Sequence, residues 1–302
     1  MSEEKNVVEP LSYSDHLHQI VSLYEGARWD YRLWWITSSA LAMHYGFWDK
    51  ESSNHAEALI NMNRALATRA EVQPGDHVLD AGCGVGGSAI WLAREYGVRV
   101  VGITLVPSEV ERGRRYARQR EVADLVTLER QDMARTAFPD SSFDVIWAIE
   151  SVCYVPDKRD FLAEARRLLK PGGRLVVADG FRPRRPFSPV DERLLHNMLA
   201  GWAVPDLATP EEFTEAARQV GFVHVRFEDV TTNIWPSAQR LYCIARMLYS
   251  VGVVKRALGL FTDVQLGNRR AVLEQYRVIQ RGLAIYDIVT AAHFAGTRRV
   301  TR

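Results

Sequence analysis

The chain has 302 residues, 47% of them hydrophobic and 25% charged, and a formal net charge of +1 at pH 7. This composition is typical of a globular protein. It excludes a disordered chain, a collagen-like repeat and a nucleic-acid binder that works through bulk positive charge. No apolar run reaches the ~18 residues of a membrane span, and the acidic N-terminus lacks the apolar core of a secretory signal. The three cysteines are 70 and 90 positions apart, too far for a CxxC pair or a disulfide framework, so we expect a cytoplasmic protein.

The first 70 or so residues have helical character and are unusually aromatic. Eight aromatic residues occupy positions 24–48, several times the 10% average of the chain: Tyr24, Trp29, Tyr31, Trp34, Trp35, Tyr45, Phe47 and Trp48. An aromatic stripe on a helix either packs in a core or lines a pocket, and both interpretations stay open for positions 24–35. For positions 45–48, which lie in a predicted loop, we favour a pocket wall. We therefore predict a helical N-terminal cap over residues 1–70.

Residues 72–180 alternate short β-rich runs with helical patterns. The predicted strands are 77–81, 98–104, 125–128, 143–149 and 174–178, and the predicted helices are 87–96, 107–120 and 158–170. This alternation is typical of a parallel sheet covered by helices. Pro171, Gly172 and Gly173 predict the end of the last of these helices.

The remainder of the chain predicts two further helices, two strands and an insertion. Helices are expected over 189–202 and from Pro210 to Gly221, with Thr209 as the cap of the second. Strands are expected over 222–230 and 283–290. The interval between these strands is too long for a hairpin and has helical periodicity at 237–249 and 269–281. We therefore predict a domain over residues 71–302 that carries a helical lid inserted at about 233–282.

A glycine-rich turn follows the first predicted strand. Asp80 precedes Gly82, Gly84 and Gly86, and a predicted helix follows. Glycines allow the backbone to approach a ligand closely. A dinucleotide pyrophosphate would also suit such a turn, but the carboxylate of Asp80 would repel it. The same carboxylate would attract the ammonium group of S-adenosylmethionine, which also carries a sulfonium.

Residues 72–180 resemble the class I S-adenosylmethionine-dependent methyltransferases. Residues 80–84 resemble the first motif of that family, and residues 102–107 resemble the Gly-Ile-Thr-Leu-Ser-Pro stretch of tocopherol, sterol and cyclopropane-lipid methyltransferases. The resemblance implies a Rossmann-like α/β fold with a seven-strand, mostly parallel sheet. Most of the superfamily has an acidic residue at the position of Thr104, so the ribose contact passes to Thr104, Leu105 or Glu109. Residues 130–133 resemble the adenine-contacting turn, which implies cofactor contacts for Asp132 and Met133, and we add Ile149 at the end of the fourth strand.

Glu150 follows an apolar run at the end of the fourth predicted strand, where ligands of open α/β sheets bind. It is either a structural acid that accepts backbone N–H groups, or a general base or counter-charge. The stretch 148–153 resembles the Ile-Glu-Ala-Thr-Cys-His stretch of sterol C-methyltransferases and the Glu-Ser-Thr segment of prenyl diphosphate C-methyltransferases. In those families a glutamate at this place serves the carbocation formed when an alkene attacks the methyl group.

Further site residues follow from aromatic and basic clusters. Residues 44–49 resemble motifs of sterol and tocopherol methyltransferases, and aromatic faces stabilise cations. We therefore expect Tyr45 and Trp48 to act with Glu150. The expected substrate-binding residues are Tyr24, Trp35, His44, Phe47, Tyr154, Arg182 and Arg185. The two arginines, with Arg184, would pair with a diphosphate, although a solvated basic loop explains them equally well.

Together these patterns predict an S-adenosylmethionine-dependent methyltransferase that acts on a small lipophilic acceptor. The favoured reaction is C-methylation of an isoprenoid alkene, such as a prenyl diphosphate, through a carbocation. The alternative is O-, N- or C-methylation of an aromatic secondary metabolite, and a remote one is a non-catalytic scaffold. No dedicated metal site is predicted, but a diphosphate substrate would bring Mg²⁺. We expect no nucleic-acid partner and no membrane span, and an aromatic-rich cap that could pair subunits in a homo-oligomer.

Overall fold

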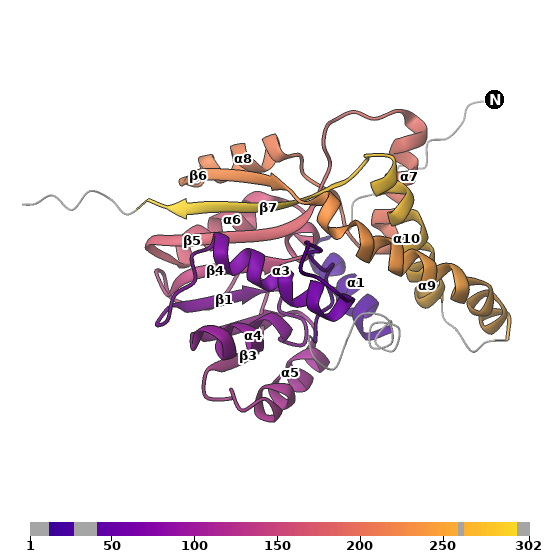
Figure 1. Cartoon of the computed structure of the whole chain (residues 1–302). Coiled ribbons are helices and arrows are strands. Elements are labelled where there is room, and N and C mark those ends of the chain that lie inside the picture. The colour runs from indigo at the N-terminus through magenta and orange to yellow at the C-terminus, as the bar shows by residue number, and fades with distance from the viewer. Residues whose placement is uncertain (1–11, 27–40, 259–262, 295–302) are drawn as a thin grey trace, which may run out of the picture.

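The computed structural model describes residues 12–26, 41–258 and 263–294, which form a twisted sheet with helices on both faces (Figure 1). The strands are β1 (His77–Ala81), β2 (Arg99–Thr104), β3 (Val126–Arg130), β4 (Phe143–Ile149), β5 (Leu169–Phe181), β6 (Phe222–Asp229) and β7 (Ile285–His293). Their order is β3-β2-β1-β4-β5-β7-β6. Strands β1 to β5 run parallel, and β7 pairs antiparallel with both β5 and β6. The predicted seven-strand, mostly parallel sheet is confirmed.

Helices precede or connect these strands, and some of them begin at capping residues visible in the sequence. They are α1 (Tyr13–Gly26), α3 (His55–Arg69), α4 (Gly87–Tyr96), α5 (Pro107–Gln119), the 3₁₀ helix η1 (Val152–Tyr154), α6 (Lys158–Leu168), α7 (Pro189–Gly201), α8 (Pro210–Gln219), α9 (Thr231–Ala257) and α10 (Asp263–Gln280). Asn54 accepts a hydrogen bond from the backbone of Glu57 at the start of α3. Thr209 and Glu212 form a reciprocal capping box at α8, as its sequence suggests.

The core lies in two layers on either side of the sheet. Val145 and Trp147 of β4 pack with residues of α3, α4, α5 and the start of α9. Ile146 and Ala148 of the same strand pack with α6 and α8 on the other face. Because the central strands are buried on both faces, their sequences are continuously apolar rather than alternating.

The join between α6 and β5 differs from the prediction. The helix ends at Leu168, and the strand begins at Leu169, before the Pro-Gly-Gly stretch. Phe143 pairs with Leu169 but Val145 pairs with Arg174, so the proline and glycines form a bulge within the strand. Gly172 has a φ of 83°, which L side chains rarely adopt. The helix therefore does end close to Pro171, Gly172 and Gly173, as predicted, but these residues belong to the strand and not to the loop that was expected.

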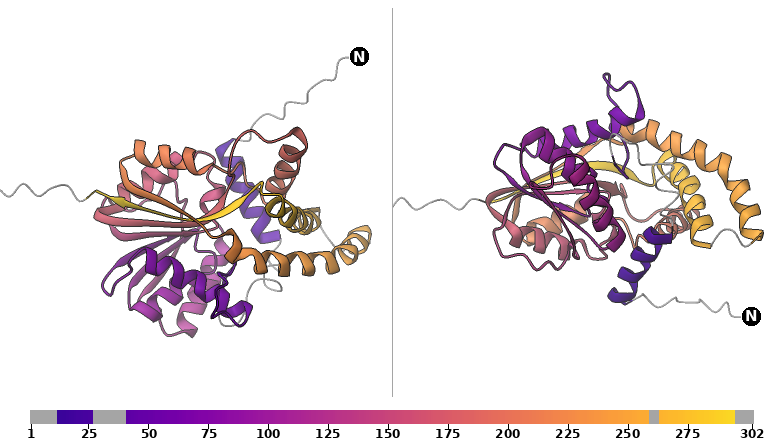
Figure 2. Two further views of the ribbon diagram at one scale, coloured as in Figure 1. Left: turned by 45° about the horizontal axis from the view of Figure 1, so that its top comes forward. Right: turned by 90° about the horizontal axis from the view of Figure 1, so that it is seen from below.

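The N-terminal helix and the inserted helices gather at the carboxyl ends of the parallel strands (Figures 1 and 2). The inserted pair, α9 and α10, lies between β6 and β7 as expected, but α9 begins at Thr231, ahead of Pro236. The predicted N-terminal cap contains α1 and α3 with the non-helical segment 41–54 before α3. Met62 and Leu66 of α3 belong to the core of the sheet. The boundary between a cap over residues 1–70 and a domain over residues 71–302 stays a prediction. Trp29, Tyr31, Trp34 and Trp35 lie outside the described residues.

Within the described residues, none of the helices is both long enough and apolar enough to cross a membrane.

Candidate active site

Two pockets meet at the carboxyl ends of β1, β4 and β5. The first pocket is bounded by α1, the glycine-rich turn and the ends of β2 and β3. The second pocket is bounded by η1, α7, α9, α10 and β7, and encloses about 900 Å³ including its open mouth, a size typical of small-molecule sites. Four residues line both pockets: Tyr24, Met43, Glu150 and Tyr154. The two spaces therefore share one boundary, with Glu150 in it.

The glycine-rich turn forms the floor of the first pocket. Gly82 and Gly84 have φ values of 85° and 52°. A Cβ on Gly82 would collide with the side chain of Ser151, and one on Gly84 would lie 2.8 Å from Cε of Met43. The absence of side chains therefore lets the turn pack closely against Ser151 and Met43, while Gly82 and Gly84 line the pocket with their backbone.

Two buried carboxyl groups face this floor. Burial raises the pKa of Asp80 to about 7 and the pKa of Glu109 to about 7. Oδ2 of Asp80 is buried and has no hydrogen-bond partner among the described residues. Thr104 donates its hydroxyl to Oε2 of Glu109 over 2.7 Å, so it positions a carboxylate rather than replacing one. A cation in this pocket would stabilise the ionised form of both acids.

Asp132 links the first pocket to α1. Its Oδ1 accepts the backbone N–H of Ala134 over 2.9 Å, and its Oδ2 accepts the hydroxyl of Tyr13 over 2.7 Å. His16 donates Nε2–H to the carbonyl of Tyr154 over 2.7 Å. Leu105, Met133 and Ile149 line this pocket too. Every predicted cofactor residue thus lines this pocket, whereas Tyr13, which lines it too, was missed because its partner Asp132 is 119 positions away.

Glu150 is held at the boundary by two donors. Its Oε1 accepts the backbone N–H of Tyr45 over 2.7 Å and the hydroxyl of Tyr286 over 2.9 Å. Both bonds favour the carboxylate, yet withdrawal from water dominates and raises the pKa of Glu150 to about 8. Its φ of 48° is unusual for a residue with a side chain, and such strain concentrates at functional sites. Glu150 can therefore be both a structural acid and a catalytic one. Its Oε1 is held by two donors, while its side chain still lines both pockets.

Tyrosines surround this carboxyl group. Tyr45 and Tyr286 meet edge to face with ring centroids 5.9 Å apart. Tyr24 and Tyr154 do the same at 6.0 Å, and their hydroxyls are 2.9 Å apart. His44 lines the first pocket, and burial lowers the pKa of its imidazole to about 4. The predicted residues Tyr24, His44, Tyr45 and Tyr154 are thus brought together, and Tyr286 from β7 is added.

The second pocket holds another buried acid. Asp179 accepts the backbone N–H groups of Cys153 and Gly180 over 2.9 and 2.8 Å, and burial raises its pKa. Among the described residues that line either pocket there is no lysine and no arginine. The electrostatic environment therefore favours a neutral or positively charged group over an anion.

Phe47 and Trp48 line neither pocket, contrary to expectation. The backbone N–H of Phe47 is donated to the carbonyl of Ala58, and that of Trp48 to the carbonyl of Asn233. These two hydrogen bonds fix residues 47 and 48 between α3 and α9, and the side chains of Phe47 and Trp48 lie against those helices. Trp48 donates Nε1–H to Oγ of Ser237 over 2.9 Å. Both residues secure the loop that carries Tyr45.

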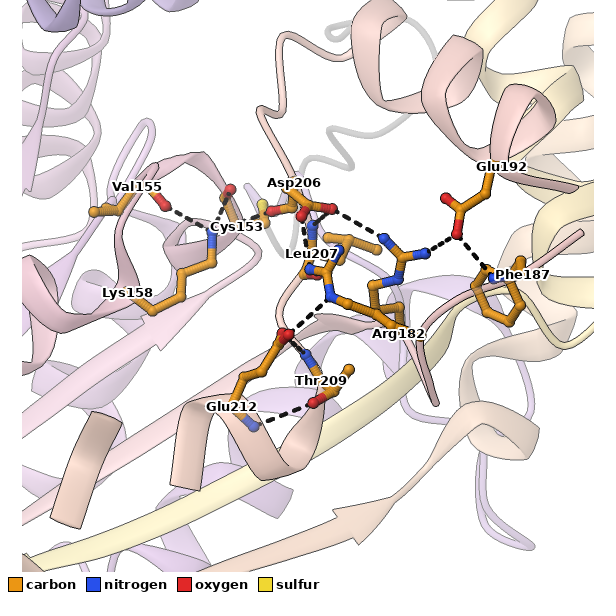
Figure 3. Close-up of polar contacts among 11 residues, drawn as sticks. Cys153, Val155, Lys158, Arg182, Phe187, Glu192, Asp206, Leu207, Thr209 and Glu212 are labelled. Atoms are coloured by element: carbon orange, nitrogen blue, oxygen red, sulfur yellow. Dashed lines mark hydrogen bonds and ion pairs between the residues drawn. The ribbon is translucent and has the colours of Figure 1, made fainter. Parts of the chain in front are cut away.

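Arg182 and Arg185 also lie outside both pockets. Figure 3 shows Arg182 between Glu192 and Asp206. Arg182 is only 4% exposed and pairs with Glu192 at 2.6 Å and Asp206 at 3.5 Å. Arg185 pairs with Asp206 at 2.6 Å and Glu212 at 2.8 Å. Acids from α7, α8 and the connecting loop thus neutralise both guanidinium groups. The geometry gives the predicted diphosphate contact no support.

Within the described residues, no group of three or more His, Cys, Asp or Glu side chains could hold a metal ion. The prediction that the chain has no dedicated metal site stays a prediction.

Comparisons with known proteins agree with this geometry. A family model described as a methyltransferase domain matches residues 79–177. The chain is 34% identical over 196 residues to the 27-O-demethylrifamycin SV methyltransferase of Amycolatopsis mediterranei, a match covering 65% of this chain and 71% of that protein. It is 33% identical over 213 residues to a probable tocopherol O-methyltransferase of Oryza sativa subsp. japonica, covering 65% of this chain and 59% of that protein.

A third relative and a solved structure extend the comparison. The chain is 30% identical over 238 residues to the sterol 24-C-methyltransferase of Eremothecium gossypii, covering 76% of this chain and 63% of that protein. The chain thus spans about three fifths of the length of the rice and Eremothecium relatives. The geranyl diphosphate C-methyltransferase from Streptomyces coelicolor A3(2), solved with Mg²⁺, geranyl diphosphate and S-adenosyl-L-homocysteine, shares the fold. Its TM-score is 0.70 and its identity 24%, over 94% of this chain and 100% of that chain.

The residues of the first pocket fit a positively charged nucleoside donor. Oδ2 of Asp80, which has no partner among the described residues, suits an ammonium group, and the backbone of Gly82 and Gly84 lines the same pocket. Asp132 has accepting oxygens for an adenine amino group. Sheet order, glycine-rich turn and matched relatives agree, and the chain belongs to the S-adenosylmethionine-dependent methyltransferases.

Proposed function

We propose that this methyltransferase transfers its methyl group to a carbon of a neutral, lipophilic isoprenoid alkene, with Glu150 stabilising the cation that forms. The observation that carries the proposal is the position of Glu150. It lies where the two pockets meet, among Tyr24, Tyr45, Tyr154 and Tyr286, with no lysine or arginine among the described lining residues.

The first pocket is assigned to the donor, which supplies an electrophilic methyl group on a positively charged sulfur when it is bound. Asp80 would take its ammonium group, and Glu109, positioned by Thr104, would take the ribose hydroxyls. Asp132 and Met133 would contact the adenine. These residues would hold the donor beside the shared boundary, and alignment of the two reactants is the main contribution of such a site.

The second pocket is assigned to the acceptor. When the π electrons of an alkene form the new C–C bond, the C–S bond breaks and the neighbouring carbon becomes cationic. Glu150 is in the right place to stabilise this charge and then to accept a proton from an adjacent carbon, which restores a double bond. Its pKa of about 8 makes it a stronger base than an exposed glutamate. Tyrosine faces contribute roughly 0.5–2 kcal/mol each to a desolvated cation.

A second candidate is O-methylation of a phenol or another hydroxyl. The specific support is again the raised pKa of Glu150, which suits removal of a hydroxyl proton. The rifamycin and tocopherol relatives carry O-methyltransferase activities in their names, which points the same way.

A diphosphate acceptor has less support. Asp179 and Glu150 would repel its charge when ionised and would give it no counter-charge when protonated, and Arg182 and Arg185 are paired with acids. The proposed reaction therefore needs no Mg²⁺. We also propose that it takes place in a reducing compartment, because Cys83, Cys153 and Cys243 are free thiols. Assembly into a homo-oligomer stays a prediction.

The test is incubation with methyl-labelled donor and a panel of neutral isoprenoid alkenes, sterols, phenols and prenyl diphosphates, followed by location of the label. We expect label on carbon of a neutral alkene, with no change on addition of EDTA. Glu150→Gln should bind the donor but lose turnover. Label on oxygen alone would select the second candidate, and label in a diphosphate alone would refute the assignment of the acceptor.

A further inference from the structure

The inserted helices α9 and α10, called here the inserted hairpin, are unusual at the end far from the sheet, both in their charge and in their exposed apolar side chains. Residues 231–281 include eight Lys or Arg and two Asp or Glu, a local net charge of +6 that leaves −5 for the rest of the chain. The hairpin tip, defined here as residues 246–258, holds three of these basic residues and no acid. Both views of Figure 2 show this end of α9 extending beyond the sheet and its covering helices.

Exposed apolar side chains gather on the same tip. Six large hydrophobic side chains are exposed in the described part of the chain, and four of them lie in the tip: Met247, Val251, Val253 and Leu258. Their exposed fractions are 76, 47, 45 and 67%, respectively. Arg246 and Arg256 are exposed next to them. Apolar and basic side chains together are the combination that binds anionic lipid surfaces.

The arrangement favours a lipid surface over a protein partner. Met247 and Val251 are four positions apart and share one side of α9, whereas Val253 is two positions further and points about 200° away from Val251. A protein partner would cover one side of a protruding helix end. A lipid interface surrounds it and can receive apolar side chains on opposite sides while the arginines remain among the headgroups.

We infer that the hairpin tip inserts into the headgroup region of an anionic lipid bilayer and holds the enzyme there as a peripheral protein. The other end of the hairpin supports this role, because Ile234 of α9 and Gln275 and Ile279 of α10 line the second pocket. Ile234 and Val251 are 17 positions apart in α9, about 25 Å along the helix, so attachment through the tip would hold the pocket at about that distance from the bilayer, in which lipophilic molecules concentrate.

The test is co-sedimentation of the full chain with vesicles of phosphatidylcholine alone and of equal parts phosphatidylcholine and phosphatidylglycerol. We expect binding to the anionic vesicles that weakens as sodium chloride is raised, because salt screens exposed charges. Arg246→Gln should reduce the partition coefficient about five-fold, the equivalent of about 1 kcal/mol for one basic residue. Met247→Asp with Val251→Asp should reduce it at least about ten-fold.

The matched control is Val190→Asp with Phe294→Asp, which changes charge equally at side chains that are 57 and 58% exposed but outside the tip. This control should bind vesicles as the wild type does. All variants should keep donor binding and thermal stability, so vesicle binding is measured independently of turnover. Absence of binding to anionic vesicles, or equal binding by the tip variant and the control, would overturn the inference. So would a wild-type dimer that the tip variant splits without any vesicle binding.

Discussion

Replacement of Glu150 by glutamine should make the protein more stable and less active, and the gain in stability should depend on pH. Glutamine keeps an oxygen that can accept from the backbone of Tyr45 and the hydroxyl of Tyr286. It removes the ionisable group whose pKa is raised from 4.5 to about 8 by withdrawal from water. A carboxyl with a raised folded-state pKa destabilises the folded protein when it ionises.

The size of the effect follows from that shift. At about 1.36 kcal/mol per pH unit, a rise from 4.5 to about 8 corresponds to roughly 5 kcal/mol as an upper figure. Glu150 is partly accessible from the pockets, so solvent reduces the cost, and we expect about 2–3 kcal/mol. The penalty is absent below about pH 4.5, grows as pH rises and is complete above about pH 8.

The assay is equilibrium unfolding in urea at pH 5, 7 and 9, followed by tryptophan fluorescence. Wild type and Glu150→Gln should have similar unfolding free energies at pH 5, and the variant should be the more stable at pH 9. Its kcat should fall by about 10²–10⁴ if Glu150 is the base.

A control separates stability from catalysis. Asp287 is buried, its Oδ2 has no partner among the described residues, and it lines neither pocket. Burial raises its pKa to about 7. Asp287→Asn should therefore gain stability at high pH and keep its turnover. An unfolding free-energy difference between wild type and Glu150→Gln that is the same at every pH would refute the reasoning.

Three further predictions concern residues around the pockets. Asp80→Asn should weaken binding of S-adenosylmethionine at least about ten-fold through loss of a charged hydrogen bond. Binding of the donor to the wild type near pH 7 should release protons, measured by calorimetry in two buffers, because the pKa of Asp80 is about 7 without a ligand. Binding without proton release would contradict the role of Asp80. Tyr286→Phe removes the hydroxyl that donates to Oε1 of Glu150 and should move the midpoint of the pH dependence of kcat upward by about one unit. An unmoved midpoint would show that this hydrogen bond does not lower the pKa of Glu150. Arg185→Met loses exposed ion pairs worth about 1 kcal/mol, so thermal denaturation should show a small loss and kcat/KM should change less than about three-fold; a hundred-fold loss would restore the diphosphate interpretation.

The sequence located the parts of the site that local patterns determine. Asp80 lies near the end of the buried strand β1, and Gly82 and Gly84 lie in the turn directly after it, so their meeting at a pocket follows from strand direction alone. Glu150 could be placed for the same reason. Thr104 lines the first pocket, but its hydrogen bond to Glu109 depends on how α5 packs at the end of β2.

Other features depend on contacts between distant segments. Tyr286 is 136 positions from Glu150 and meets it only because β7 inserts between β5 and β6. In the non-helical segment near Tyr45 the sequence could not show that Trp48 points toward α9 instead of the pocket. The basic run after β5 suggested an anion site because its acidic partner Asp206 comes from a later loop.

The most direct test of the central claim compares two ligands that differ only in charge. A neutral isoprenoid hydrocarbon and its amine analogue, with a protonated nitrogen at the carbon that would become cationic, are titrated into the enzyme with bound S-adenosylhomocysteine. If Glu150 and its tyrosines stabilise a positive charge, the amine should bind at least about ten-fold more tightly, and Glu150→Gln should abolish the difference. Equal affinity for both ligands in the wild type would contradict the account.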